Sequence, residues 1–280
     1  MKKICRKLLR IIQIIVSMFK WKKCIPVVST IGKDSLLSGK VALIVGGSGG
    51  IGYAIAKSFV ASGCKVVLAG TNEAKLKKLS SELSDCSYLT INLTDITSFE
   101  EKLSAAVNLF GSIDILVCSS GVHVTRNGFD FGSVLEAEYD KIMNINLKGT
   151  YFISQTVANY MKKNHVKGHI LLISSNRGIE PAWSPYSLSK LALNGFTAGM
   201  AKKLIPHGIV VNAIAPGPTA TTMQEPGIAG SIYTEQTPIE RYTMPEEVAE
   251  YAKMMVSSLG DTIVGDTIYM TGGRGIIEQR

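Results

Sequence analysis

Tyr186 and Lys190, at the two ends of the run Tyr186-Ser-Leu-Ser-Lys190, are the residues whose types and spacing point most directly to chemistry. Side chains four positions apart lie on one face of a helix. A lysine ammonium held beside a phenol favours the phenolate, which lowers the tyrosine pKa from about 10 toward neutrality. Such a phenol exchanges a proton with a carbonyl or alcohol oxygen. Many surface helices carry this pair, so the spacing needs support from elsewhere in the chain.

A glycine-rich run, Gly46-Gly-Ser-Gly-Gly50-Ile-Gly52, supplies that support. It follows the apolar residues 41–45, a predicted strand, and opens a helical pattern over residues 53–59. Glycine lets the backbone approach a pyrophosphate closely, and the first N–H groups of a helix bind phosphates. A glycine turn between a strand and a helix therefore predicts a dinucleotide-binding site.

The same run also matches Gly-x-Ser-x-Gly, the nucleophile elbow of α/β-hydrolases. An elbow serine needs an acid and then a histidine further along the chain. The only histidine in the last hundred residues is His207, in a predicted turn between Pro206 and Gly208. A hydrolase explains neither Gly52 nor the Tyr–Lys pair, so the dinucleotide interpretation is preferred.

The elements that position these motifs follow from the hydrophobic pattern. Apolar runs, predicted as strands, recur at residues 41–45, 65–69, 88–91, 113–118, 169–174, 209–215 and 267–271. Near-continuous apolar strands suit a parallel sheet covered on both faces, and the intervening segments are long enough for helices. The sequence predicts an α/β fold with a doubly wound parallel sheet of about seven strands. Residues 37–280 form a single domain, and residues 1–36 are a separate extension.

Charge is distributed unevenly along the 280 residues. The net charge is +8, but residues 1–33 hold nine lysines and arginines and no acid, which leaves 21 basic and 22 acidic residues in the rest. The body is therefore close to neutral. It has no basic patch interleaved with aromatic residues, so nucleic acid is excluded as a partner.

Residues 1–23 alternate basic and apolar residues at helical spacing. The longest uncharged run, residues 11–19, is too short to span a bilayer, and no small-residue cleavage site follows it. Three interpretations remain open: an amphipathic helix on an anionic membrane surface, an organelle import presequence, or a helix docked on the body or on a partner subunit. The width of the apolar face favours peripheral membrane contact.

Cysteine and histidine usage limits compartment and metal content. The five cysteines are odd in number and form no Cys-x-x-Cys pair, which favours a reducing, cytoplasmic location. His165 and His169 are four apart, but Gly168 and a predicted strand start separate them. No metal site is predicted.

The ordered motifs resemble those of the short-chain dehydrogenases/reductases over roughly residues 37–275. The glycine turn matches that family's Thr-Gly-x3-Gly-x-Gly pattern, with Val45 in place of the threonine. The run from Cys118 to Gly121 stands where the family has Asn-Asn-Ala-Gly, and Pro216-Gly217 matches its Pro-Gly turn after strand six. The resemblance implies a Rossmann fold and hydride transfer between a nicotinamide cofactor and a carbonyl or secondary alcohol.

The resemblance also implies catalytic roles. Tyr186 is expected as general acid/base, with Lys190 lowering its pKa and holding the nicotinamide ribose. Ser175 is expected to hydrogen-bond the substrate oxygen, and Asn146 to anchor a proton-relaying water. Ser174 is a neighbouring rival for Ser175, as Asn144 is for Asn146. The alternative function is a catalytically weak NAD(P)-binding protein with a regulatory or structural role.

The cofactor is expected to be NADP(H) in preference to NAD(H). Strand two ends in Ala69-Gly70-Thr71-Asn72, and no acid to bind the ribose hydroxyls of NAD occurs before Glu73. Asn92 stands where relatives carry an aspartate against the adenine. The expected cofactor-binding residues are Gly46, Ser48, Gly50, Ile51, Gly52, Thr71, Asn72, Asn92, Leu93, Gly121, Tyr186, Lys190, Pro216, Gly217 and Thr219.

The expected partner is a small-molecule carbonyl or alcohol whose identity the sequence does not reveal. Residues 122–131, 177–184 and 219–243 are expected to face it, and the last segment has the length and the prolines and glycines of a closing lid. By resemblance, the helices that end near Lys163 and Leu204 pair across the interface of a homodimer or homotetramer.

Overall fold

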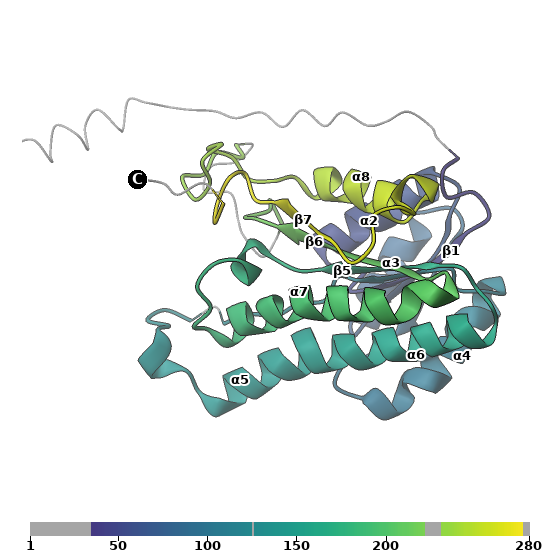
Figure 1. The fold of residues 1–280 in the computed structure, drawn as a ribbon, viewed down its shortest axis with the longest axis horizontal. Coiled ribbons are helices and arrows are strands. Elements are labelled where there is room, and N and C mark those ends of the chain that lie inside the picture. Colours follow the sequence, from purple (N-terminus) through teal and green to yellow (C-terminus); the bar gives the residue numbers. More distant parts are fainter. Residues whose placement is uncertain (1–34, 125, 222–230, 277–280) are drawn as a thin grey trace, which may run out of the picture.

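A computed structural model describes residues 35–124, 126–221 and 231–276 (Figure 1). Its centre is a seven-stranded parallel sheet in the order β3-β2-β1-β4-β5-β6-β7. The predicted α/β doubly wound sheet is confirmed. The strands are β1 (Val41–Val45), β2 (Lys65–Gly70), β3 (Cys86–Thr90), β4 (Ile115–Cys118), β5 (His169–Ile173), β6 (Val210–Pro216) and β7 (Thr267–Met270).

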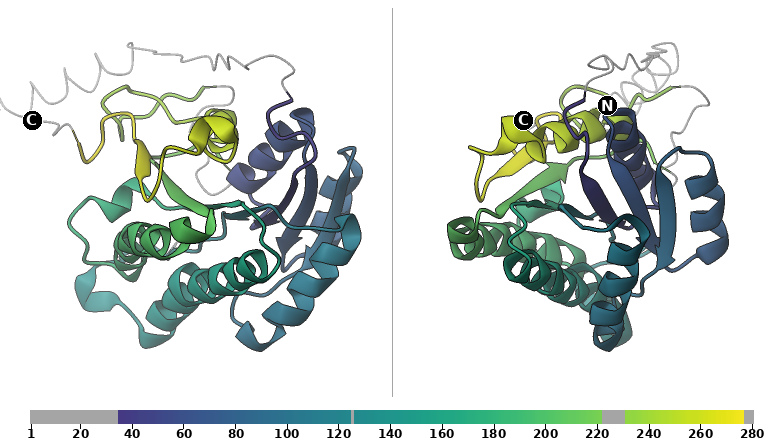
Figure 2. Two further views of the ribbon diagram at one scale, coloured as in Figure 1. Left: turned by 45° about the vertical axis from the view of Figure 1, so that its right-hand side comes forward. Right: turned by 90° about the vertical axis from the view of Figure 1, so that its right-hand side faces the viewer.

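Helices cover both faces of the sheet (Figure 2). They are α2 (Gly50–Ala61), α3 (Glu73–Ser81), α4 (Phe99–Phe110), α5 (Glu136–Ile142), α6 (Thr150–Lys163), α7 (Pro185–Leu204) and α8 (Pro245–Met255). One buried cluster joins α4, α6 and α7 to the sheet, and a second joins α2, α3 and α8 to the opposite face. Successive strand residues enter opposite clusters, as Leu43 and Ile44 do. This explains why the strands read as unbroken apolar runs.

The strand ends differ from the predicted ones by one or two residues. β3 begins at Cys86 rather than at 88, because Cys86 pairs with Val66 of β2. β4 begins at Ile115 rather than at 113, where Ala42 of β1 faces it. Asp114 instead binds the start of β1, and its carboxylate accepts a hydrogen bond from the amide of Val41 (3.0 Å).

Local chemistry fixes the start of α7, the helix that carries the Tyr–Lys pair. The hydroxyl of Ser184 accepts a hydrogen bond from the amide of Ser187 (3.1 Å), and Pro185 occupies the first helical position. Both are preferred at a helix N-terminus. Tyr186 therefore lies in the first turn of α7, with Lys190 one turn further along.

Leu36 and Leu37 are among the first residues that the structure describes. Leu37 is fully buried, and its amide donates to the carbonyl of Ser62 (3.2 Å). The prediction for residues 1–23 lies outside the described residues. Among the helices that the structure describes, none is long and apolar enough to cross a membrane.

Candidate active site

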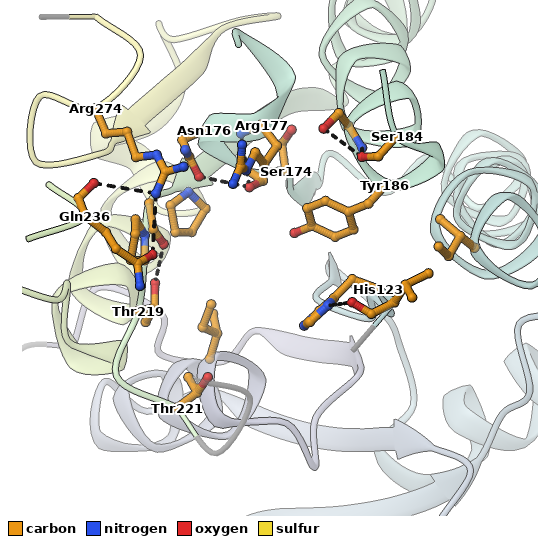
Figure 3. A pocket seen from close by; sticks show the side chains of 18 of the residues that line it. His123, Ser174, Asn176, Arg177, Ser184, Tyr186, Thr219, Thr221, Gln236 and Arg274 are labelled. Atoms are coloured by element: carbon orange, nitrogen blue, oxygen red, sulfur yellow. Dashed lines mark hydrogen bonds between the residues drawn. The ribbon is translucent and has the colours of Figure 1, made fainter. Parts of the chain in front are cut away.

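The carboxyl ends of β1, β5 and β6 border a cavity of about 340 Å³ (Figure 3). Ligands of open α/β sheets bind at this edge. Six of the predicted residues line it: Ile51, Ser175, Tyr186, Pro216, Gly217 and Thr219. The remaining wall is formed by His123, Val124, Phe129, Ile142, Ser174, Asn176, Arg177, Trp183, Ser184, Ser187, Pro218, Thr221, Gln236 and Arg274.

The phenol of Tyr186 points into this cavity (Figure 3). Burial raises the pKa of Tyr186, while a hydrogen bond with Ser175 and the charge of Arg177 act to lower it. The structure therefore couples the Tyr186 hydroxyl to Ser175, the partner expected for the substrate oxygen. His123 lies edge-on to the Tyr186 ring at a centroid distance of 6.0 Å and forms part of the same wall.

Lys190 lies beside Tyr186 on α7. Its Nζ lies over the ring of Tyr186, 5.7 Å from the centroid, and donates to the carbonyl of Ile173 (2.8 Å). Burial lowers the pKa of Lys190 itself to about 8.

The two neighbouring serines have separate surroundings. Ser174 donates from Oγ to Oδ1 of Asn194 (2.6 Å), which ties the end of β5 to α7. The hydroxyl of Ser175 accepts from the amide of Arg177 (3.2 Å) and interacts with Tyr186. Ser174 is thus engaged in packing, and Ser175 is the serine coupled to the phenol.

Asn146 is fully buried in a π-helical segment, Met143–Gly149, between α5 and α6. Its Oδ1 accepts from the amide of Val122 (2.9 Å), and its Nδ2 donates to the Val122 carbonyl (3.0 Å) and to Oγ of Ser189 (3.2 Å). The wider π turn lets this side chain reach both the loop after β4 and helix α7. Asn146 therefore fixes the loop from Gly121 to Val122 beside the Tyr186 helix.

The glycine turn fits a dinucleotide. Gly46 has a φ of +87°, and a Cβ there would lie 2.5 Å from the amide nitrogen of Ser120. A Cβ on Gly52 would overlap the carbonyl of Gly46. No side chain caps the N-terminus of α2 in the described structure, so its first amides are available to phosphate. The turn brings the backbone close enough to hold a pyrophosphate.

The residues expected around the adenosine end are partly engaged with their own backbone. Asn72 caps α3, with Oδ1 accepting from the amide of Lys75 (2.9 Å). Oδ1 of Asn92 accepts from the amide and hydroxyl of Thr94 (3.1 and 2.9 Å). Each amide NH₂ remains on the exposed side of its turn as a donor. Thr71 is exposed, and Leu93 is buried.

Gly70 and Ser48 lie side by side, although they belong to different strand ends. A Cβ on Gly70 would meet Oγ of Ser48 at 3.4 Å. The site expected for a 2′-phosphate therefore has a small residue and a hydroxyl, and Thr71 follows directly. An acidic side chain at this position would repel the 2′-phosphate, whereas Gly70 leaves the space open.

The segment from Cys118 to Gly121, which replaces the family's Asn-Asn-Ala-Gly, is held in place mainly by close packing. The thiol of Cys118 is buried, lies 3.9 Å from Oγ of Ser154, and has its pKa raised to about 12 by burial. The amide of Ser119 donates to the carbonyl of Val45 (2.8 Å), which joins this segment to the glycine turn. A Cβ on Gly121 would lie 3.5 Å from Nζ of Lys190. Gly121 thus leaves room for the lysine.

Thr221 falls within the segment 219–243 expected to face the substrate, but the sequence analysis did not expect it to contact the glycine turn. Thr219 donates its hydroxyl to the carbonyl of Gly217 (2.9 Å) and so stabilises its own turn. Thr221, two residues further on, lies against the glycine turn, where a Cβ on Gly50 would meet its Cγ2 at 2.7 Å. The available signal was the run of threonines after Pro216-Gly217. Of the predicted lid, residues 222–230 lie outside the described residues.

The wall opposite Tyr186 combines residues of two expected segments with Asn176 and Arg274, which the sequence analysis missed. Asn176, Gln236 and Arg274 line the cavity, and Glu180 binds behind them. Arg274 comes from the last described turn of the chain, after β7. Sequence order gave no reason to place it beside residues 176–180. As for metals, no cluster of three histidine, cysteine or acidic residues occurs within residues 35–124, 126–221 and 231–276.

Comparison with known proteins identifies the family. The family model described as short chain dehydrogenase matches residues 40–229. A 3-oxoacyl-[acyl-carrier-protein] reductase from Rickettsia bellii is 35% identical over 241 residues, covering 85% of this chain and 97% of its own. One from Thermotoga maritima is 33% identical over 245 residues, with coverages of 85% and 98%.

Solved structures agree with these relatives. The crystal structure of a 3-oxoacyl-[acyl-carrier protein] reductase from Brucella melitensis superposes with a TM-score of 0.79 at 28% identity, covering 90% of this chain and 98% of its own. The actinorhodin polyketide ketoreductase, crystallised with NADPH, gives 0.78 at 26%, with coverages of 87% and 99%. The chain belongs to the short-chain dehydrogenase family and is a nicotinamide-dependent oxidoreductase that transfers a hydride between its cofactor and a carbonyl or alcohol.

Proposed function

We propose that this chain is an NADP(H)-dependent reductase of 3-oxoacyl thioesters, with Tyr186 as its general acid. The observation that carries the proposal is that Tyr186 and Ser175 line one cavity at the carboxyl edge of the sheet. The relatives named as 3-oxoacyl-[acyl-carrier-protein] reductases support the substrate class. The cavity offers an apolar wall, where Phe129 and Trp183 have ring centroids 5.5 Å apart, and a polar wall around Arg274.

In this mechanism the residues of the chain orient the substrate and move one proton. The nicotinamide supplies the hydride when bound. The Ser175 hydroxyl donates to the substrate carbonyl and stabilises the negative charge that develops on its oxygen. Tyr186 transfers its proton to that oxygen. Lys190 holds the ribose, and Asn146 keeps the adjoining loop in place and anchors the water that returns a proton toward the site.

Support for NADP(H) over NAD(H) comes from the end of β2. Gly70 and Ser48 leave space and a hydroxyl where an acidic side chain would select NAD. Around this end we assign Thr71, Asn72, Asn92 and Leu93 to the adenosine. The pyrophosphate is assigned to the glycine turn, from Gly46 through Ser48, Gly50 and Ile51 to Gly52, and the nicotinamide to Gly121, Pro216, Gly217 and Thr219.

The test compares Tyr186→Phe with Tyr160→Phe, a control on α6 outside the cavity. With NADPH and a 3-oxobutanoyl thioester, Tyr186→Phe is expected to lower kcat by about 10³-fold or more, because the proton donor is lost while the ring remains. NADPH binding, followed by fluorescence, should persist. Turnover retained in Tyr186→Phe contradicts the assigned role. A wild-type chain that binds NADPH but reduces no carbonyl favours the alternative of a regulatory or structural NAD(P)-binding protein.

We further propose a homodimer or homotetramer assembled through α6 and α7. Tyr151 and Phe196 stack at 4.7 Å on this face, and a Cβ added at Gly195 or Gly199 would meet no atom within 4 Å. Leu191, which also lies on α7, is 49% exposed. An exposed apolar face with small residues suits helix-to-helix contact between subunits. Leu191→Glu should reduce the mass measured by light scattering, whereas an unchanged mass contradicts this interface.

Residues 1–36 are proposed as an appended segment on a cytoplasmic enzyme, with residues 1–23 contacting anionic membrane surfaces. The support is the nine basic residues without an acid in residues 1–33, set among apolar residues. Co-sedimentation with anionic liposomes tests it: the full chain should pellet more than a chain that starts at Leu37. Equal pelleting contradicts membrane contact.

A further inference from the structure

Arg274 enters the cavity wall from the turn that follows β7. The amide of Arg274 donates to the carbonyl of Thr271 (3.2 Å), and the carbonyl of Gly272 accepts from the amide of Ile239 (3.2 Å). Gly275 has a φ of +76°, and a Cβ there would press on Cγ of Glu180 at 3.3 Å. The turn thus packs closely on the loop after β5. Its backbone shape directs Arg274 toward the site.

One carboxylate serves two guanidinium groups at this wall. Oε1 of Glu180 accepts from Nε of Arg274 (2.9 Å), and Oε2 accepts from Nη1 of Arg177 (2.6 Å). Both arginines line the cavity, and no aspartate or glutamate does so in the described part of the wall. Two positive charges and one negative charge leave the wall with a net charge of about +1. The wall therefore favours an electron-rich group on the ligand.

Arg274 combines unused donors with a less exposed position than that of Arg177. A guanidinium carries five N–H donors. Nε binds Glu180, and Nη1 makes only long contacts of 3.5 and 3.4 Å with the backbone and side-chain oxygens of Gln236. Among the described residues, Nη2 has no hydrogen-bond partner. The Arg274 side chain is 24% exposed against 45% for Arg177, so its interactions are less screened by water.

Arg274 and Tyr186 stand on opposite sides of the same cavity (Figure 3). A substrate whose carbonyl is held by Tyr186 and Ser175 extends its remaining atoms toward the wall of Arg274, Gln236 and Asn176. A simple ketone has no second hydrogen-bond acceptor for this guanidinium. A 3-oxo compound has one, because its second oxygen is attached two carbons away from the ketone carbon.

We propose that Arg274, held in place by Glu180, binds a second acceptor oxygen of the substrate and so selects 3-oxo compounds over simple ketones. The acceptor is either the carbonyl oxygen of a thioester or the carboxylate of a free 3-oxo acid. This inference rests on the proposed reductase function. Glu180 acts as a positioning residue, because it holds Nε of Arg274 while the other nitrogens face the ligand.

The experiment measures kcat/KM of the full chain with NADPH and three matched substrates: a neutral 3-oxobutanoyl thioester of N-acetylcysteamine, 3-oxobutanoate, and pentan-2-one. Arg274→Gln is expected to lower kcat/KM by about 10- to 100-fold for substrates with a second oxygen, the range of a lost charge-assisted hydrogen bond. Pentan-2-one should change less than about 3-fold. A larger loss for 3-oxobutanoate identifies a carboxylate as the preferred acceptor, and a larger loss for the thioester identifies its carbonyl.

Two further variants keep the result interpretable. Lys40→Gln is the control, since Lys40 pairs with Asp114 (3.8 Å) and does not line the cavity; it should leave all three substrates unchanged. Glu180→Gln should raise KM for the thioester with little change in kcat, a split that a general loss of folding does not produce. NADPH binding confirms that each variant is folded.

The outcomes separate the two proposals. A wild-type chain that reduces none of the three substrates overturns the reductase function. A wild-type chain that reduces them, combined with an Arg274→Gln variant that affects all substrates equally or none, overturns the role of Arg274 while the reductase function stands.

Discussion

The ammonium of Lys190 lies over the ring of Tyr186, 5.7 Å from its centroid, with the carbonyl of Ile173 as its hydrogen-bond acceptor. The pair is therefore joined through the end of β5 as well as through the helix they share. A cation over an aromatic face is attracted by the ring quadrupole.

The buried Lys190 predicts a dependence of folding stability on pH. Its pKa is about 8 in the folded protein and 10.5 when unperturbed, so the unfolded chain binds more protons between these values. Stability from this group therefore rises as pH increases from about 8 to 10.5. Lys190→Met should remove this rise. Thermal denaturation of both proteins without cofactor, compared from pH 7 to 10.5, measures the difference.

Cysteines remote from Lys190 cancel in that comparison, whereas Cys118, whose charge interacts with Lys190, does not. Burial raises the pKa of Cys64 and Cys86 from 9.0 to about 12 in the folded protein. Their contribution has the opposite sign, because the folded chain binds more protons, but it is present in both proteins. A wild-type minus variant difference that stays flat from pH 8 to 10.5 contradicts the prediction.

Ser175→Ala and Ser174→Ala should have different consequences. Ser175 lines the cavity beside Tyr186, so its loss is expected to lower kcat by about 10²- to 10³-fold, with a stability loss of only about 1 kcal/mol from its bond to the Arg177 amide. Ser174 binds Asn194 at 2.6 Å, so its loss should lower the free energy of unfolding by about 1–2 kcal/mol. Steady-state kinetics and urea denaturation of each variant provide the check. The reverse pattern would reassign the catalytic serine to Ser174.

Asn146→Ala should weaken both folding and catalysis. It leaves the amide and the carbonyl of Val122 without their buried partner, at an expected loss of about 2–4 kcal/mol in unfolding free energy. The loop beside Gly121 then loses its anchor, and kcat should fall as well. Asn144→Ala, at a partly buried neighbouring position, is the control. Equal effects of the two substitutions would contradict a specific role for Asn146.

Gly70→Asp should shift cofactor preference from NADPH toward NADH. An aspartate at the end of β2 accepts hydrogen bonds from ribose hydroxyls and repels a 2′-phosphate. We expect kcat/KM for NADPH to fall at least about tenfold relative to that for NADH. Gly70→Asn, of equal size but uncharged, separates charge from bulk near Ser48. A wild-type preference for NADH beyond tenfold refutes the NADP(H) assignment.

Much of this protein was determined by local sequence. The alternation of apolar runs with amphipathic segments predicted the doubly wound sheet, because strands covered on both faces must be apolar at successive positions. Strand ends shifted by up to two residues, as at Cys86, since pairing with a neighbouring strand decides where a ladder begins. The glycine turn and the Tyr186–Lys190 spacing could be recognised in the sequence because each motif lies within a few consecutive residues.

The tertiary structure decided what lies between segments distant in the chain. It separated Ser174 from Ser175 and set Thr221 against Gly50. It also brought Arg274 to Glu180, 94 positions away. The spacing of Lys190 from Tyr186 predicted a shared helix face, but only the fold shows that the ammonium binds the carbonyl of Ile173. Helix periodicity fixes which side chains are neighbours, whereas the direction of a long side chain depends on the acceptors that the fold places around it.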